Sequence, residues 1–277
     1  MPVTIGVSMA LFPAELPLDG KLAAIAAAGF AQAELPSAES FWRMDPAQAR
    51  DAFARYGVRP RSAHSLDAGW DNDAPDPATR RASVDKVSSV FAVAAAIGVE
   101  VIVVHPNARY THEFFESDYE ASIVRSVGSL KELSLRAAAH GLKLAVENVP
   151  RRGAPRPGGT LAEILAMIDG LGPHVGVCVD VGHSNANGCS AAEDLRAAAG
   201  RVFAVHLQDN DGKGDDQHRL PGEGTIDWPA VAAALERYAP GASINFEIGP
   251  SAGAAAEVLA TLARFRDRFF TLSPGRG

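Results

Sequence analysis

The chain has 277 residues, of which 47% are hydrophobic and 21% charged, the balance of an ordinary globular protein. With 26 Lys and Arg against 33 Asp and Glu, its formal net charge is -7. That charge disfavours a protein that grips nucleic acid through its phosphates, because such binding needs a surplus of positive side chains. Two cysteines, Cys178 and Cys189, are too few for a disulfide framework or a cysteine zinc site.

The first residues, Met1–Gly6, have a strand-like pattern and lack the basic segment and long apolar run of a secretory signal. No stretch of about 18 apolar residues is free of Gly, Pro and charge, so no membrane span is expected. We therefore predict a cytoplasmic protein with no membrane partner.

Short β-branched runs alternate with longer Ala- and Leu-rich segments of helical periodicity along the chain. The eight expected strands are residues 3–7, 31–35, 58–64, 99–105, 142–147, 175–180, 202–207 and 243–248. The expected helices are residues 20–28, 46–56, 78–97, 119–140, 160–168, 191–199, 228–238 and 252–269. Asp45, Thr160 and Asp227 are typical N-cap residues at three of these helices.

Strict alternation of strands and helices predicts parallel strands joined by right-handed crossovers. Eight such units in a chain of this length favour one (β/α)8 barrel over residues 1–272, followed by a flexible tail over 273–277. The alternative is an open doubly wound sheet. No Gly-x-Gly-x-x-Gly follows the first expected strand, so no nucleotide cofactor is expected.

Polar side chains mark the ends of six apolar strands. They are His64, His105, Glu147, Asp180, His206 and Glu247. In a barrel, the carboxyl ends of the strands meet at one mouth, where active sites of this fold are built. A single histidine there is more often structural, but carboxylates after apolar runs are costly to bury unless they are paired or bind a metal. The pattern therefore predicts a metal site.

The segment after the seventh strand adds further candidates, because Asp216 and His218 alternate and could point in one direction. The alternative is a solvated acidic loop, and this segment taken alone would favour that alternative.

Four motifs together resemble the xylose isomerase-like barrel superfamily, which joins sugar isomerases and epimerases with nucleases of the endonuclease IV type. The motifs are Val146-Glu147-Asn148, Val179-Asp180-Val181-Gly182-His183, His206-Leu207-Gln208-Asp209 and His218-Arg219-Leu220-Pro221-Gly222-Glu223-Gly224-Thr225-Ile226-Asp227. Each is weak alone, but their order on strands five to eight is specific, and the resemblance covers nearly the whole chain.

The isomerase branch implies one divalent ion held by Glu147, Asp180, His206 and Glu247. Such an oxygen and nitrogen ligand set suits Mn²⁺, Co²⁺ or Mg²⁺. The resemblance also implies that the two glutamates act as acid and base, moving a proton α to a carbonyl of a small sugar, keto-sugar or polyol derivative through an enediolate. The side chains expected to contact that substrate are His183, Arg219, His64, His105 and Glu34, with pairing to a neighbour as the alternative for Glu34.

The endonuclease branch implies nine ligands that hold three zinc ions. Their candidates here are His64, His105, Glu147, Asp180, His183, His206, Asp216, His218 and Glu247. The negative charge and the segments Val149-Pro150-Arg151-Arg152-Gly153 and Val179-Asp180-Val181-Gly182-His183 depart from the nuclease pattern. We therefore favour an isomerase or epimerase over a zinc phosphodiesterase. A lyase or dehydratase is a third alternative on the same scaffold, and a homodimer or homotetramer is a possible assembly because both are frequent in the family.

Two groups near the expected mouth have open roles. Arg151, Arg152 and Arg156 follow the fifth strand and would either bind a substrate phosphate or lie in a solvated loop. Aromatic side chains in the loops after strands three and four would either cover the pocket or anchor those loops; they are Trp70, Tyr110, Phe114 and Phe115. Cys178 lies in an apolar strand and is expected in the core.

Overall fold

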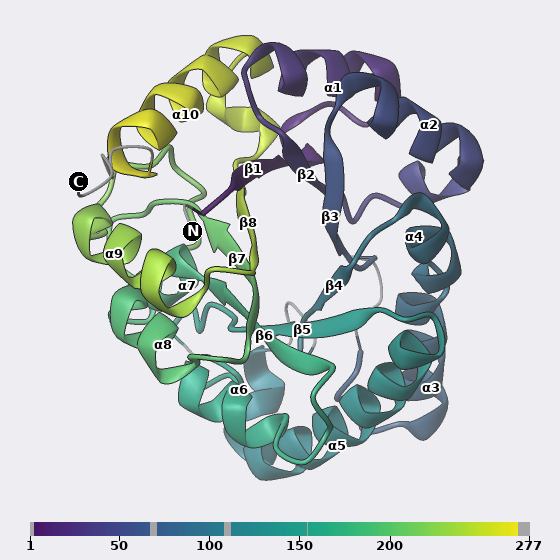
Figure 1. Cartoon of the computed structure of the whole chain (residues 1–277). Helices are drawn as coiled ribbons and strands as arrows, with labels where there is room; N and C mark the ends of the chain where they lie inside the picture. Colours follow the sequence, from purple (N-terminus) through teal and green to yellow (C-terminus); the bar gives the residue numbers. More distant parts are fainter. Residues whose placement is uncertain (1–2, 67–70, 108–111, 154, 271–277) are drawn as a thin grey trace.

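Eight parallel strands close into a barrel in the order of the sequence, from β1 to β8 and back to β1 (Figure 1). This computed structural model describes residues 3–66, 71–107, 112–153 and 155–270, with the backbone alone for 112–117. The strands are β1 Ile5–Ser8, β2 Gln32–Leu35, β3 Arg59–His64, β4 Val101–Val104, β5 Lys143–Glu147, β6 Val175–Asp180, β7 Val202–Leu207 and β8 Ser243–Phe246. The expected tail, Trp70, Tyr110 and the side chains of Phe114 and Phe115 fall outside the described part.

Helices surround the ring of strands (Figure 1). They are α1 Leu18–Ala27, α2 Pro46–Tyr56, α3 Pro77–Ser88, α4 Phe91–Ile97, α5 His112–Ala139, α6 Leu161–Met167, α7 Val181–Ala186, α8 Ala191–Ala197, α9 Trp228–Tyr238 and α10 Ala255–Phe270. Helix α10 packs against both α1 and α9, which closes the outer layer. The predicted (β/α)8 barrel is confirmed. No helix in the described residues has the length and apolar character needed to cross a bilayer.

Local sequence signals placed most helix boundaries correctly. Asp45 accepts hydrogen bonds from the backbone of Ala47 at the start of α2, over 2.8 Å. Thr160 and Glu163 form a reciprocal capping box at the start of α6. Asp227 caps α9 by accepting from the Ala230 N–H over 3.1 Å. These bonds satisfy backbone donors that a helix leaves unpaired at its first turn.

The helices of the structure differ from the expected ones in three places. The helix expected over 78–97 is interrupted, because α3 ends at Ser88 and α4 begins at Phe91. The hydroxyls of Ser88 and Ser89 bond to backbone carbonyls of the preceding turn, over 2.8 Å and 2.7 Å, as serines near helix ends commonly do. Helix α5 begins at His112 rather than at 119, and the prediction found only the part beyond a non-helical kink at Asp118.

The third difference is α7, a six-residue helix that no expected element covers. Asp180 caps it by accepting a hydrogen bond from the backbone N–H of His183 over 2.7 Å. Six residues are too few for helical periodicity to be visible in a sequence.

The apolar core has two parts. The larger part fills the space between the barrel and the helices. The smaller part lies inside the barrel and consists of Val101, Val103, Ala145, Cys178 and Ala204, which confirms the expected core position of Cys178. The other half of the barrel interior is polar, as described below for the strands β2, β3 and β8.

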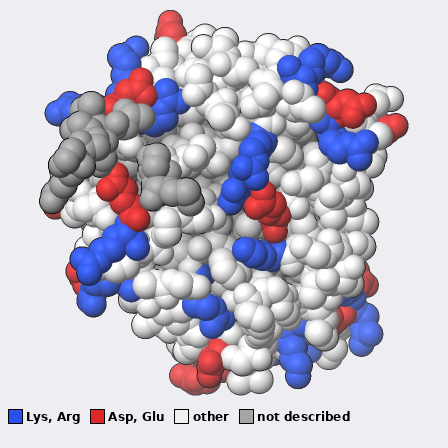
Figure 2. Space-filling view, viewed as in Figure 1, with Lys and Arg blue, Asp and Glu red and all other residues white. Residues whose placement is uncertain are grey.

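Surface charges of both signs are interspersed on the face of the molecule that Figure 2 shows. Opposite charges also pair among the described residues, as the Glu100 carboxylate does with Arg59 over 2.9 Å and with Arg61 over 3.6 Å. This face therefore carries no continuous basic patch among the described residues.

Barrel closure leaves no space beside Gly6 on β1. A Cβ atom there would lie 2.4 Å from the carbonyl oxygen of Gln32 on β2 and 2.6 Å from Oδ1 of Asn245 on β8, the two strands that pair with β1 on either side. Gly128 in α5 is the opposite case, because nothing lies within 4 Å of the Cβ that it lacks.

We predict that Gly6→Ala lowers the free energy of unfolding by about 1–3 kcal/mol, the usual cost of overpacking a core. Gly128→Ala is the control and should raise it by about 0.8–1.0 kcal/mol through helix propensity. Urea unfolding followed by circular dichroism measures both. Equal midpoints for the two variants would contradict the close packing inferred at Gly6.

Candidate active site

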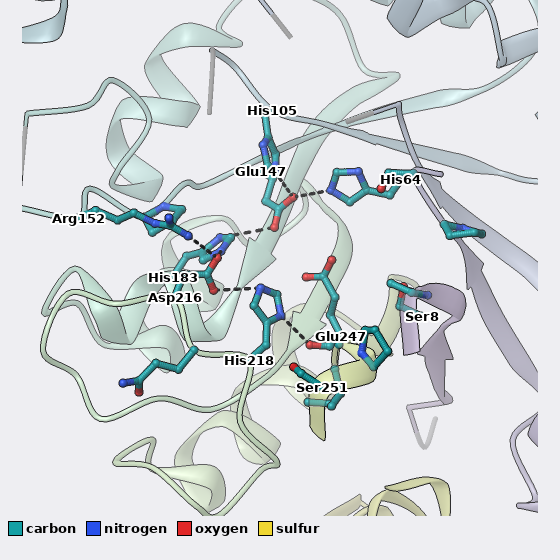
Figure 3. Close-up of a pocket in the computed structure, with 18 of the residues that line it drawn as sticks. Ser8, His64, His105, Glu147, Arg152, His183, Asp216, His218, Glu247 and Ser251 are labelled. Atoms are coloured by element: carbon teal, nitrogen blue, oxygen red, sulfur yellow. Dashed lines mark hydrogen bonds and ion pairs between the residues drawn. The ribbon is translucent and has the colours of Figure 1, made fainter. Parts of the chain in front are cut away.

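The polar side chains at the strand ends meet at one mouth of the barrel (Figure 3). They line a pocket of about 370 Å³ together with residues of the loops that follow β5, β7 and β8. Of the nine predicted ligands, seven line this pocket: His64, His105, Glu147, His183, Asp216, His218 and Glu247. The other two, Asp180 and His206, are fully buried. The predicted convergence of the strand ends is confirmed.

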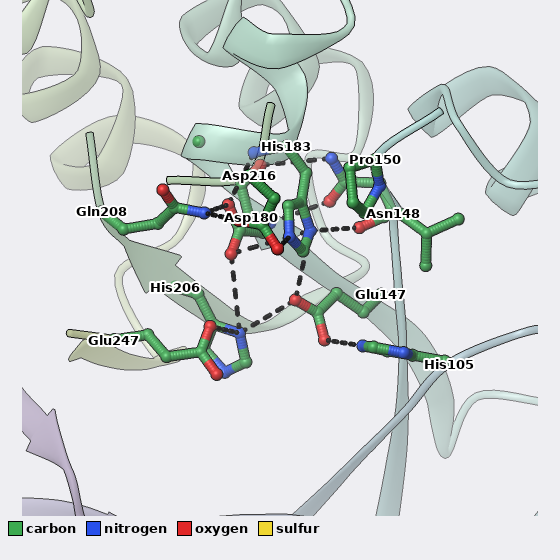
Figure 4. A network of polar contacts seen from close by, with 12 residues as sticks. His105, Glu147, Asn148, Pro150, Asp180, His183, His206, Gln208, Asp216 and Glu247 are labelled. Carbon is green, nitrogen blue, oxygen red and sulfur yellow. Dashed lines mark hydrogen bonds and ion pairs between the residues drawn. The ribbon is translucent and has the colours of Figure 1, made fainter. Parts of the chain in front are cut away.

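The first cluster consists of Glu147, Asp180, His206 and Glu247, whose nearest ligand atoms all lie within 4.8 Å of one another (Figure 4). Nδ1 of His206 lies 3.0 Å from Oε1 of Glu147 and 3.1 Å from Oε2 of Glu247. Oδ2 of Asp180 is buried and accepts no hydrogen bond from the described residues. Three carboxylates and one imidazole are a donor set that suits a divalent cation, so the residues fit the expected metal.

Burial and the neighbouring imidazoles shift the pKa values of the three carboxylates in this cluster. Burial raises the pKa of Asp180 to about 6, against the opposing effect of His183. Burial also favours a raised pKa for Glu247, but the neighbouring His206 outweighs it and lowers that pKa to about 2. The same balance holds the pKa of Glu147 well below its usual range. The neighbouring imidazoles therefore supply positive charge to Glu147 and Glu247.

The second cluster lies on the other side of Glu147 and adds two histidines. Nε2 of His105 lies 3.0 Å, and Nε2 of His64 3.3 Å, from Oε2 of Glu147. Burial lowers the pKa of His105 to about 4 despite the nearby carboxylate. Neutral imidazole is the form that binds metals. Because Glu147 turns one oxygen to each cluster, its carboxylate could contribute a ligand to a cation held by either one.

The third cluster joins α7 to the loop after β7. Asp216 lies 3.4 Å from Nε2 of His183 and 3.0 Å from Nε2 of His218. Its side chain is 7% exposed, so the solvated acidic loop considered for this segment is wrong for Asp216. Burial lowers the pKa of both histidines, but Asp180 and Asp216 outweigh it at His183, raising that pKa to about 9, and Asp216 raises the pKa of His218 to about 10.

The backbone of His218 is strained, and a contact with the end of β8 fixes its side chain. Its φ of 45° lies in the left-handed region that side chains other than glycine rarely adopt, and its Nδ1 lies 2.8 Å from the backbone carbonyl of Glu247. Strained residues of this kind persist where the surrounding structure fixes them, often at functional sites.

Two amides that the sequence analysis did not single out support the clusters. Asn148 accepts a hydrogen bond from the Asp180 N–H over 2.8 Å, and its own amide donates to the Asp180 carbonyl. Gln208 donates to Asp216 over 2.8 Å. Gly182 makes room for this amide, because a Cβ would lie 2.2 Å from Cδ of Gln208. The feature of the sequence that could have identified these two amides is their position, because Asn148 follows Glu147 and Gln208 lies two residues beyond His206.

Two predicted substrate contacts lie elsewhere. Glu34 is fully buried and bonds to Ser62 and His206, which is the pairing that was its alternative role. Arg219 belongs to a short antiparallel bridge with Asp209, and its guanidinium lies 3.4 Å from Asp211. Among the described residues, neither lines the pocket. Tertiary contacts keep the side chains of Glu34 and Arg219 away from the pocket, and a local sequence pattern does not encode such contacts.

The three arginines after β5 have different positions. Arg152 and Arg156 line the pocket, whereas Arg151 pairs with Glu163 over 2.9 Å. Arg156 is 1% exposed and donates to Oδ1 of Asn107 and to the carbonyl of Pro150. The solvated loop considered for these residues is therefore wrong for Arg156.

Comparisons with known proteins agree with this architecture. A probable endonuclease 4 of Thermoplasma volcanium is 35% identical over 112 residues, which cover 36% of this chain and 40% of that protein. A D-psicose 3-epimerase of Enterocloster bolteae is 28% identical over 120 residues, covering 43% and 38%. The chain spans about half the length, 53–57%, of the first curated relatives that it matches.

Solved structures extend the similarity to the whole barrel. A D-tagatose 3-epimerase-like protein superposes with a TM-score of 0.82 at 21% identity, covering 96% of this chain and 98% of the other. At this identity the superposition shows the fold. The sequence profile of the xylose isomerase-like TIM barrel family matches residues 22–265. The chain therefore belongs to the xylose isomerase-like TIM barrel family.

Proposed function

We propose that this protein is a divalent-metal-dependent isomerase or epimerase of a small sugar, keto-sugar or polyol derivative. The observation that carries the proposal is that Glu147 and Glu247 belong to one four-residue cluster, with Asp180 and His206, and both line the pocket. The pocket volume of about 370 Å³ lies in the range of small-molecule sites. The epimerases among the similar proteins support the substrate class.

The two glutamates have different surroundings that suit different roles. The Glu247 side chain is 16% exposed, whereas Glu147 is 1% exposed. A bound cation would polarise carbonyl and hydroxyl oxygens of the substrate and stabilise an enediolate. One glutamate then removes the proton α to the carbonyl and the other returns one, while the pocket-lining imidazole of His183 binds a substrate oxygen. The carboxylate-rich first cluster favours Mn²⁺, Co²⁺ or Mg²⁺.

We predict that Glu147→Gln and Glu247→Gln each reduce turnover by about 10²–10⁴-fold, the usual contribution of a general acid or base. Glu257→Gln, on the exposed face of α10, is the matched control and should keep wild-type turnover. Keto-sugars are screened in deuterated water, where exchange at the carbon beside the carbonyl is followed by NMR. Wild-type exchange rates in both site variants would remove the acid and base roles.

A second candidate function rests on the three clusters taken together. All nine residues implied for the nuclease branch fall into them, and Glu147 belongs to two. That arrangement supports a trinuclear zinc enzyme that hydrolyses phosphodiesters, as does the endonuclease among the relatives. The net charge of -7 opposes a DNA substrate, because it supplies no general attraction to a phosphate backbone. The isomerase therefore remains our first proposal.

Metal content separates the two candidates. For the isomerase, we predict about one Mn, Co or Mg per chain in protein purified without chelator, and loss of turnover after dialysis against EDTA. A value near three zinc ions would favour the hydrolase instead, and cleavage of an abasic duplex by the zinc-loaded protein would establish it. Elemental analysis measures the metal content, and a gel assay measures cleavage of the abasic duplex.

His218→Ala sharpens the comparison, because His218 belongs to the third cluster alone. Under the isomerase proposal, the variant keeps its one metal ion. Under the hydrolase alternative, it loses about one of three zinc ions. An abasic-site activity that is absent at full zinc loading would end the nuclease alternative.

A further inference from the structure

Glu34 on β2 contacts the side of the His206 ring that faces away from the pocket. Nε2 of His206 lies 3.0 Å from Oε1 and 3.1 Å from Oε2 of Glu34. Both side chains have no exposed surface. The opposite ring nitrogen, Nδ1, faces Glu147 and Glu247 in the first cluster. One imidazole therefore connects a fully buried carboxylate to the candidate metal site.

We infer that Glu34 is a positioning residue that fixes the ring orientation and tautomer of His206 so that the Nδ1 lone pair faces the cation. A metal-binding imidazole carries one N–H, and its other nitrogen supplies the lone pair. Carboxylates lie beside both ring nitrogens, but Glu147 and Glu247 beside Nδ1 would be engaged by the cation. Nε2 therefore donates to Glu34, and the Nδ1 lone pair is left for the cation. A carboxylate on the far nitrogen also makes the ring a stronger ligand.

The inside of the barrel holds Glu34 in turn. Ser62 donates to Oε2 of Glu34 over 2.7 Å, and Ser62 receives hydrogen bonds from the Ser243 hydroxyl over 2.9 Å and from the Asn245 amide over 3.2 Å. The register between β2 and β3 shifts between Ala33 and Glu34, which pairs Glu34 with Ser62. A chain of hydrogen bonds from β8 through β3 to β2 therefore fixes the carboxylate that fixes His206.

Energetics favour this role over a purely structural one. A buried carboxylate is costly unless it is paired, and the described partners of Glu34 are the Ser62 hydroxyl and the His206 ring. Among the described residues, Glu34 does not line the pocket, so it does not reach a substrate held there. Its effect should appear in metal affinity rather than in substrate affinity.

The test is titration of Mn²⁺ into metal-free protein by calorimetry, comparing the wild type with Glu34→Gln and Glu34→Ala. We expect affinity to fall about 10-fold to 100-fold, the usual effect of losing such a partner, and to fall further in Glu34→Ala. Glutamine can still accept from Nε2 but has no charge, so it also serves if the alanine variant folds poorly. Ser129→Ala, which loses the buried hydrogen bond from α5 to the backbone carbonyl of Asn72 and lies outside this hydrogen-bond chain, is the matched control and should bind Mn²⁺ within twofold of the wild type.

A spectroscopic measurement tests the tautomer directly. In zinc-loaded protein, long-range ¹⁵N–¹H NMR spectra report which ring nitrogen carries the proton, and His206→Asn identifies the signals of this ring. We expect the proton on Nε2 in the wild type and in Glu34→Gln. A proton on Nδ1, or wild-type Mn²⁺ affinity in folded Glu34→Gln and Glu34→Ala, would overturn the inference.

This inference rests on the metal site of the proposed function, but the two fail differently. If the wild type binds no divalent cation, the proposed function is wrong. If it binds Mn²⁺ and both Glu34 variants bind equally well, the metal site stands and the role of Glu34 is wrong. Neither outcome depends on finding the substrate.

Discussion

The carboxylate of Glu147 is the group on which the rest of the site depends. Its two oxygens contact imidazoles that come from four separate places in the fold: His206 and His183 at Oε1, and His105 and His64 at Oε2. A charge this deeply buried is tolerated only with such compensation. Removing it would take away the carboxylate that these imidazoles share, so the two clusters that contain Glu147 exist as one unit.

Closure of the barrel is what makes this unit possible. Strand β5 carries Glu147 between β4 and β6, and the parallel register sets Glu147 beside Cys178. The two halves of the barrel interior differ in the polarity of their side chains. Small apolar side chains fill the part near β4 to β7, while Ser62, Ser243 and Asn245 form hydrogen bonds across β3 and β8. The polar half does not resemble an ordinary core, because its hydrogen bonds lead through Glu34 to His206, the imidazole of the first cluster.

The arrangement also explains why one family can host distinct chemistries. Under our proposal the first cluster alone would hold one cation between two glutamates, whereas His64 and His105 on one side, and Asp216 and His218 on the other, would add ligands for further cations. Fold and family do not decide between these possibilities. The measured number of bound ions would decide between them, because the two proposals require different metal contents.

Local patterns in the sequence were enough to predict the eight β/α units, the caps at Asp45, Thr160 and Asp227, and the strand ends that carry the site. Periodicity and capping depend on neighbours a few residues apart. Only the tertiary structure decided which ends share a cluster, that Arg219 lies outside the pocket, and that Glu34 supports His206 from within the barrel. Glu34 and His206 are 172 residues apart, and no local pattern encodes a contact that exists only once β2 and β7 are closed into one ring.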